Sequence, residues 1–231
     1  MELIIKAKGI VKTFVDGEVE TPVLKGIDLE IKRGEFLSIM GRSGAGKSTL
    51  IYQLGLLDEP TGGQIDINGT DTLALNWSKK TDFRLKYLGY VFQDYALVPE
   101  LTAVENVALP LLMRGIQTNK ALEKAREVLH TLELHQQVNN FPSQLSGGEQ
   151  QRVSIARAIV DEPEIIFCDE PTANLDSLSA RVVIDILKKL NKSGQTIVMV
   201  THEDEYARQT DRIIKLADGL IESEEILTPA K

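Results

Sequence analysis

Short runs of alternating apolar and polar residues mark the first third of the chain. Strands are predicted at residues 2–11, 24–31 and 64–67, where the apolar side chains can share one face. The last run is followed by Asn68-Gly69, a pair typical of a tight hairpin turn. Because short strands joined by turns pair with their neighbours, the pattern indicates an antiparallel lobe.

Unbroken apolar runs predict a second kind of strand, which is buried on both faces. The segments between these runs have helical spacing, and the combination is typical of an α/β sheet. The runs lie at residues 36–40, 87–92, 165–168, 195–201 and 212–216.

The stretch from residue 100 to residue 160 has a helical pattern instead. Thr102 and Glu105 have the spacing of a capping box at the start of a helix, which Pro110 is expected to interrupt. Apolar residues then recur at helical spacing over residues 121–132. Further helices are predicted at residues 153–160 and from Asp176 or Ser177 to Leu190.

A glycine-rich loop joins the buried strand 36–40 to the helical pattern that begins near Lys47. It matches the phosphate-loop motif, in which backbone N–H groups converge on phosphate oxygens and the lysine reaches the β- and γ-phosphates. The hydroxyl after the lysine binds Mg²⁺ in this motif, and the helix dipole favours an anion at the helix start. Nucleoside triphosphate binding is therefore predicted for Gly41, Ser43, Gly44, Ala45, Gly46, Lys47, Ser48 and Thr49.

A second serine- and glycine-rich segment precedes another helix. Ser146, Gly147 and Gly148 lie just before the predicted helix at residues 153–160. A helix N-terminus with such small residues suits an anion. The chain therefore carries two phosphate-seeking surfaces, which a single bound nucleotide need not satisfy.

Polar residues follow three of the buried strands. The strand at residues 165–168 ends in Asp169, which suits Mg²⁺, and Glu170, which could orient or deprotonate an attacking water. Gln93 and His202 each follow another strand, at the edge where ligands bind in an α/β sheet. By position alone, Gln93 is a weak signal and His202 fits a plain capping residue equally well.

Two single residues carry weaker signals. Phe14 comes shortly after the first apolar run and could stack on an adenine, although ordinary packing explains an aromatic there equally well. Cys168 is the one cysteine of the chain and lies inside an apolar run. It is interpreted as a buried, inert thiol.

Composition limits the possible partners. The 231 residues can form one large domain, or one domain with a subdomain. The net charge of −8 argues against sequence-independent nucleic-acid binding, because such binding neutralises phosphates with Lys and Arg. The same charge disfavours adsorption to an anionic membrane, so a membrane role would need a protein partner. No apolar run approaches the ~20 residues needed to cross a bilayer.

In their order and spacing, these motifs resemble the ATPase cassette of ABC proteins. The resemblance implies an α/β fold: a P-loop NTPase core with a mixed sheet, an antiparallel β subdomain and an inserted helical subdomain. The core would comprise about residues 1–94 and 161–231, and the helical subdomain about residues 95–160. The resemblance rests on GRSGAGKS at 41–48, Gln93, LSGGEQQ at 145–151, IIFCDE at 165–170, NLD at 174–176 and His202.

The resemblance also implies how ATP is used. Glu170 would act as the catalytic base, with His202 and Gln93 sensing the γ-phosphate. Mg²⁺ would be held by Ser48, Gln93 and Asp169. Phe14 would stack on the adenine, where the family more often has a tyrosine.

A homodimer is the quaternary structure that the resemblance implies. Two copies would pair head to tail, so that each ATP lies between the phosphate loop of one copy and Ser146, Gly147 and Gly148 of the other. This arrangement accounts for the second anion-binding surface.

The sequences at 91–115 and 169–177 look most like the MacB, LolD and FtsE group, whose members serve macrolide or peptide export, lipoprotein release or cell-division signalling. This implies a cytoplasmic ATPase held on the inner face of the cell membrane. Its partner would be an integral membrane permease, a separate chain with few spans and a large extracytoplasmic domain. No nucleic-acid partner is expected.

Other functions stay open. A regulatory cassette that gates an extracytoplasmic enzyme without transport would share every motif. A soluble ABC protein acting on ribosomes or DNA would usually carry paired cassettes, coiled-coil insertions or basic surfaces. A metabolic kinase or GTPase would share the phosphate loop, but LSGGEQQ has no role in either class.

Overall fold

The computed structural model describes residues 2–227 and divides the chain into two compact units. The first unit comprises Met1–Thr81 and Asn191–Lys231, and the second comprises Asp82–Leu190. The helical subdomain predicted at residues 95–160 falls within the second unit. Among the described residues, no helix combines the length and the apolar character that crossing a membrane requires.

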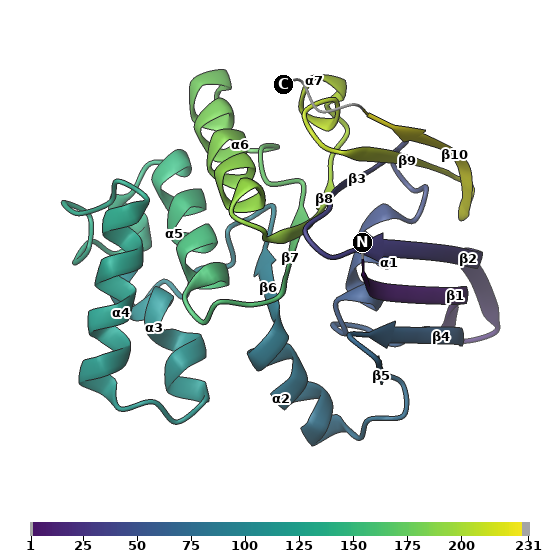
Figure 1. The fold of residues 1–231 in the computed structure, drawn as a ribbon, viewed down its shortest axis with the longest axis horizontal. Coiled ribbons are helices and arrows are strands. Elements are labelled where there is room, and N and C mark those ends of the chain that lie inside the picture. Colours follow the sequence, from purple (N-terminus) through teal and green to yellow (C-terminus); the bar gives the residue numbers. More distant parts are fainter. Residues whose placement is uncertain (1, 228–231) are drawn as a thin grey trace. The chain divides into compact units, whose positions relative to one another are not determined.

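The first unit contains the predicted antiparallel lobe (Figure 1). The strands follow the order β2-β1-β4-β5, and each neighbouring pair is antiparallel. Asn68 and Gly69 turn the β4–β5 hairpin with φ values of 53° and 74°, as the tight turn requires. The strands are β1 (Leu3–Asp16), β2 (Val19–Lys32), β4 (Gly62–Ile67) and β5 (Thr70–Asp71).

A second sheet of the first unit carries the buried strands. β3 lies between β8 and β9 and is parallel to both, whereas β10 pairs antiparallel with β9, so this sheet is mixed. The strand β10 was not predicted, because its residues are mostly exposed and acidic and its pairing partner β9 cannot be read from its own pattern. The elements are β3 (Phe36–Gly41), α1 (Lys47–Leu54), β8 (Thr196–Val200), α7 (Asp204–Ala207), β9 (Arg212–Ala217) and β10 (Leu220–Ile226).

The second unit combines a parallel strand pair with helices. β6 (Leu88–Val91) runs parallel to β7 (Ile165–Asp169). The helices α3, α4 and α5 lie side by side, which Figure 1 shows in teal and green. Helix α2 (Trp77–Tyr87), which the sequence did not predict, leads into β6. The other helices are α3 (Ala103–Met113), α4 (Thr118–Thr131), the 3₁₀ turn Pro142–Gln144, α5 (Gly147–Ile159) and α6 (Ser177–Lys192).

Helix α3 corrects one prediction. Pro110 lies inside the helix rather than ending it, and the Arg114 amide still donates to the Pro110 carbonyl at 3.2 Å. A proline in a helix interior costs roughly 3 kcal/mol. Burial of apolar side chains on both sides of it, including Val107 and Leu111, offsets that cost.

The predicted capping box begins α3. Thr102 Oγ1 accepts from the Glu105 amide, and the Glu105 carboxylate accepts from the Thr102 amide at 2.8 Å. Hydrogen bonds from the Thr102 side chain and backbone lower the pKa of Glu105. The carboxylate therefore stabilises the fold above its ordinary pKa, and this contribution is lost as the pH falls through the lowered value.

Replacing Thr102 by Ala is expected to destabilise the protein by about 1 kcal/mol at pH 7, because the Glu105 amide loses its acceptor and the Glu105 carboxylate loses the hydrogen bond from the Thr102 hydroxyl. Thermal unfolding of a chain of this size should shift by about 2–4 °C. The difference from wild type should shrink as the pH falls through the lowered pKa of Glu105, where the carboxylate becomes protonated. The control is Gln117→Ala, since the Gln117 side chain makes no cap hydrogen bond to α4. Equal midpoints for wild type and Thr102→Ala at pH 7 would contradict this prediction.

Candidate functional site

The phosphate loop joins β3 to α1 in the first unit, as predicted. Gly46 precedes the first residue of α1 with φ 96°, and a Cβ at this position would lie only 2.9 Å from Leu24 Cδ2. No acidic residue lies in the first turn of α1, and no side chain caps it. Lys47 is buried, and its Nζ donates to the Arg42 carbonyl at 3.3 Å. A helix start with this chemistry favours an anion.

His202 lies at the same edge of the sheet as the phosphate loop. β3 and β8 are parallel neighbours in which Ile39 pairs with Val200, and the Thr201 amide donates to the Ile39 carbonyl at 3.2 Å. Gly41 and His202 each follow two residues after this pair, so Gly41 ends β3 and His202 lies just past the carboxyl end of the adjacent strand β8. His202 is exposed there. The structure thus brings together two predicted site residues that are 161 positions apart in the chain.

Phe14 lies near the far end of β1, opposite Thr21 of β2. Its side chain is exposed, and Lys12 Nζ lies 4.9 Å from the ring centroid. An exposed ring is available to a ligand, whereas a packing role would bury it. Adenine stacking by Phe14 stays a prediction.

The two predicted acidic site residues, Asp169 and Glu170, lie at the end of β7, beside Gln93. In the β6–β7 pair, Val91 is opposite Cys168, so Gln93 and Glu170 each follow two residues after a paired position. Asp169 is buried, and Glu170 adopts φ 46°, which is rare for a residue with a Cβ. Such strained conformations are frequent at functional sites.

Cys168 is buried and forms no disulfide. Its burial, together with the adjacent Asp169 charge, raises the pKa of the thiol above its ordinary value. A thiol in this state is a poor nucleophile. The structure thus agrees with the interpretation of Cys168 as an inert core residue.

Ser146 caps α5, whose first two residues are Gly147 and Gly148. Its hydroxyl accepts from the Glu149 amide, and the Glu149 carboxylate accepts from the Ser146 amide at 2.8 Å. Burial opposes ionisation of Glu149, but hydrogen bonds from Ser146 and Gln137 outweigh it and lower the pKa of this carboxyl. A small-residue helix start, as predicted, thus lies in the same unit as Gln93 and Glu170.

The loop after β6 connects these groups. Asn174 Nδ2 donates to the Gln93 carbonyl at 3.0 Å, and Tyr95 Oη donates to the Asn174 carbonyl at 3.4 Å. Arg157 of α5 donates to the carbonyls of Tyr95 and Ala96. Burial lowers the pKa of Arg157, which nevertheless stays charged because an arginine pKa lies far above neutral pH.

Sequence reasoning missed Arg157 and Tyr95, and gave Asn174 no role. One signal was present: Arg157 is a charged residue inside the otherwise largely apolar run of α5, where an arginine needs polar partners. Those partners belong to a loop more than 60 residues earlier, so the sequence could not name them.

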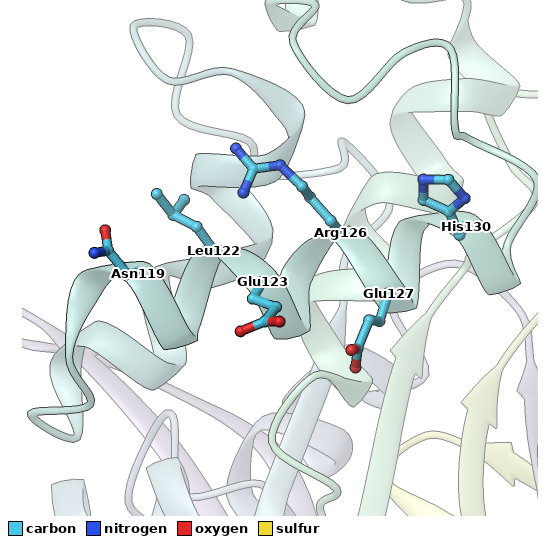
Figure 2. A pocket seen from close by; sticks show the side chains of 6 residues that line it. All are labelled: Asn119, Leu122, Glu123, Arg126, Glu127 and His130. Atoms are coloured by element: carbon cyan, nitrogen blue, oxygen red, sulfur yellow. The ribbon is translucent and has the colours of Figure 1, made fainter.

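A shallow depression runs along the outer face of α4 (Figure 2). None of the predicted site residues lines it. His130 lies at its end, and the structure places His130 and His135 on the surface with ring centroids 5.9 Å apart. The lining residues are Asn119, Leu122, Glu123, Arg126, Glu127 and His130.

The predicted metal ligands Ser48 and Asp169 carry oxygen donor atoms. Within residues 2–227, no group of three His, Cys, Asp or Glu side chains is arranged to hold a metal ion. The Ser48 hydroxyl at the start of α1 and the buried Asp169 carboxylate at the end of β7 are hard oxygen donors. Such donors suit Mg²⁺, which binds one or two protein oxygens together with phosphates and waters.

Comparison with known families identifies the fold. The family model described as ABC transporter matches residues 24–173. The chain belongs to the ABC transporter family. The predicted resemblance is therefore confirmed. Phe14 and His202 lie outside the matched residues.

Characterised and uncharacterised ABC proteins resemble the chain over most of its length. An uncharacterised ABC transporter ATP-binding protein of Methanocaldococcus jannaschii, MJ1508, is 47% identical, covering 94% of this chain and 97% of its own. The lipoprotein-releasing system ATP-binding protein LolD of Aquifex aeolicus is 46% identical over 97% and 98%. The macrolide export ATP-binding/permease protein MacB of Aggregatibacter actinomycetemcomitans is 47% identical over 96% of this chain, which spans about a third (34%) of that protein.

Solved ABC cassettes have the same fold. The ATP-binding cassette MJ0796, in a dimeric post-hydrolysis state bound to ADP and phosphate, has a TM-score of 0.91 at 44% identity, covering 98% of this chain and 100% of its own. The α/β P-loop NTPase fold is thus confirmed. The chain is an ATP-binding ABC ATPase cassette of the LolD and MacB type.

Proposed function

We propose that this chain is the ATP-hydrolysing subunit of a membrane complex and works as a homodimer around two ATP molecules. The observation that carries the proposal is the presence of two glycine-containing helix starts, at α1 and α5, in separate units of the chain, each of a kind that suits an anion. Each chain has one of each, so two copies paired head to tail complete two sites. The dimeric ADP- and phosphate-bound state of the similar cassette MJ0796 supports this pairing.

Residues of both copies of the dimer act on each ATP in this proposal. Lys47 and the phosphate-loop amides hold the phosphates, and Ser146, Gly147 and Gly148 of the partner copy contact the γ-phosphate. Glu170 accepts a proton from the attacking water, and His202 and Gln93 contact the γ-phosphate. Phe14 stacks on the adenine.

Ser48, Asp169 and Gln93 would hold Mg²⁺ in this proposal. When bound, Mg²⁺ neutralises phosphate charge that builds up during transfer. Ser48 and Asp169 contribute the hard oxygen donors described above, and the Gln93 amide oxygen is of the same type.

The membrane partner is proposed from the relatives. LolD is named for lipoprotein release, and MacB combines an ATP-binding part with a permease. We infer that this chain lies on the cytoplasmic face of a membrane, bound to a separate permease with few spans and a large extracytoplasmic domain. ATP-driven closing and opening of the dimer would drive export, lipoprotein release or transmembrane mechanical work through that permease.

A pull-down tests the partner. Tagged Glu170→Gln protein with ATP should hold the closed dimer and recover a membrane protein with few spans from detergent-solubilised membranes of its own source. Lys47→Ala is the matched control, because it lacks the lysine that reaches the phosphates. Equal recovery by both variants would show that capture does not depend on ATP. Recovery of only ribosomal or DNA-associated proteins would reject the membrane role.

A further inference from the structure

The loop that follows Gln93 has an unusual backbone. Tyr95 and Ala96 are consecutive residues with φ values of 63° and 48°, in the left-handed region. A residue with a Cβ is disfavoured there because the Cβ approaches the carbonyl oxygen. Two such residues in succession persist only where the surrounding structure holds them.

The side chain of Arg157, on helix α5, stabilises this loop conformation. Its Nη1 donates to the Ala96 carbonyl at 2.6 Å and its Nη2 to the Tyr95 carbonyl at 3.0 Å. The planar guanidinium donates to both carbonyls at once, a geometry that a lysine ammonium cannot reproduce. The Arg157 side chain is half-buried, and its bond to the Tyr95 carbonyl is partly shielded from competing water.

The same loop is tied to the segment after β7. Asn174 Nδ2 donates to the Gln93 carbonyl at 3.0 Å, and Tyr95 Oη donates to the Asn174 carbonyl. The backbone at Gln93 is thus held by Asn174 at the Gln93 carbonyl and by Arg157 at the Tyr95 carbonyl, two residues further along. Its side chain stays exposed.

Tyr95 also contacts the start of α5. A Cβ built on Gly147 would lie 2.9 Å from Tyr95 Oη, closer than Cβ atoms normally approach. The hydroxyl therefore occupies the space that only a glycine leaves open. Tyr95 thus has its carbonyl bound by Arg157 and its hydroxyl placed against Gly147, the first glycine of the LSGG segment.

We propose that Arg157 is a positioning residue that fixes the loop Gln93–Ala96 relative to Ser146 and Gly147 at the start of α5. The proposal rests on the proposed function, in which Gln93 and Ser146 contact the γ-phosphate. In this proposal Arg157 acts through the backbone carbonyls of the loop and has no catalytic step of its own. Arg157 sets the position of Gln93 through the backbone and the position of Gly147 through Tyr95. A displacement of either segment therefore displaces the other.

Steady-state ATP hydrolysis by the full chain tests this role. Arg157→Ala should lower kcat about tenfold, since small misplacements of catalytic groups have effects of this size or larger. KM for ATP should stay within about twofold, because the phosphate loop lies in the other unit and is unchanged. Arg157→Lys should give an intermediate kcat, because it keeps the charge but loses the two-pronged geometry. Arg126→Ala, which removes an exposed arginine of α4, is the matched control and should behave as wild type.

Amide hydrogen exchange provides the readout that remains if Arg157→Ala does not fold. In Arg157→Lys, the amides of residues 94–97 should exchange faster than in wild type, whereas those of α4 should be unchanged. Unchanged exchange at 94–97, or a wild-type kcat in the folded variants, would overturn the proposal. A parallel loss in kcat and thermal stability, with Lys no better than Ala, would also overturn it by showing a structural role alone.

Glu170→Gln in the same assay separates the two levels of inference. Loss of turnover in Glu170→Gln with normal kcat in Arg157→Ala would reject only the role of Arg157. Retained turnover in Glu170→Gln would reject the proposed catalytic site, whatever the Arg157 variants do.

Discussion

Replacing Glu170 by Gln is expected to reduce ATP turnover by roughly 10²–10⁴-fold, the range that a general base contributes. The amide keeps the size of the side chain but cannot accept a proton from the attacking water. ATP binding should stay close to wild type, because the phosphate loop and Lys47 are unchanged. Phosphate release under saturating ATP measures the first quantity, and equilibrium titration with a fluorescent ATP analogue measures the second.

Glu162 offers a matched control for this substitution. Like Glu170 it is a glutamate with a positive φ, at 53°, but its side chain is exposed and pairs with Lys124. Glu162→Gln should therefore keep wild-type turnover, since an exposed ion pair contributes little to the stability of the fold. If Glu170→Gln turned over ATP as fast as Glu162→Gln in a preparation free of other ATPases, Glu170 would not be the base.

Removing Arg212 is expected to produce the largest loss of stability. Its Nε donates to Glu35 Oε1 at 2.6 Å, its Nη1 to Glu224 at 2.9 Å and its Nη2 to the Glu30 carbonyl at 2.6 Å. The side chains of Arg212 and Glu35 are only 14% and 9% exposed. Arg212→Ala leaves the Glu35 carboxylate buried without this partner, so we expect a loss of about 3 kcal/mol in the free energy of unfolding.

Urea denaturation gives this free energy directly, and thermal unfolding should shift by about 6–12 °C for a chain of this size. Arg208→Ala is the control, because Arg208 pairs with Asp204 and Glu225 at the exposed surface. Its unfolding should be close to wild type, since water screens such pairs. Equal effects of the two substitutions would show that burial of the Arg212–Glu35 pair has no energetic consequence.

Much of the fold was predictable because the decisive patterns are local. Strand, glycine-rich loop and helix follow one another within residues 36–54, and the Thr102–Glu105 box and the Asn68-Gly69 turn each need only a few residues. The errors arose where tertiary contacts outweigh local preference. Pro110 stays helical because neighbouring side chains of α3 are buried, and β10 is a strand because β9 offers a pairing edge.

For the candidate site too, local patterns predicted some residues, and tertiary contacts decided which residues lie together. Lys47, Asp169, Glu170 and Ser146 could be predicted because each occupies a set position relative to its own strand or helix. Sheet register then brought together residues far apart in sequence. His202 joins the phosphate loop through the β3–β8 pair, and Gln93 joins Glu170 through the β6–β7 pair.

Motif spacing alone was enough to predict the phosphate-binding chemistry, the two helix starts suited to anions and the family, because that spacing fixes how backbone amides and side chains are presented. Only the tertiary structure decided the conformation of Tyr95 and Ala96 and the residues that hold it. Arg157 and Asn174 lie 61 and 81 positions away from the carbonyls they bind at Ala96 and Gln93. No local pattern records such partners, since the left-handed backbone is stable only after α5 has packed beside the loop.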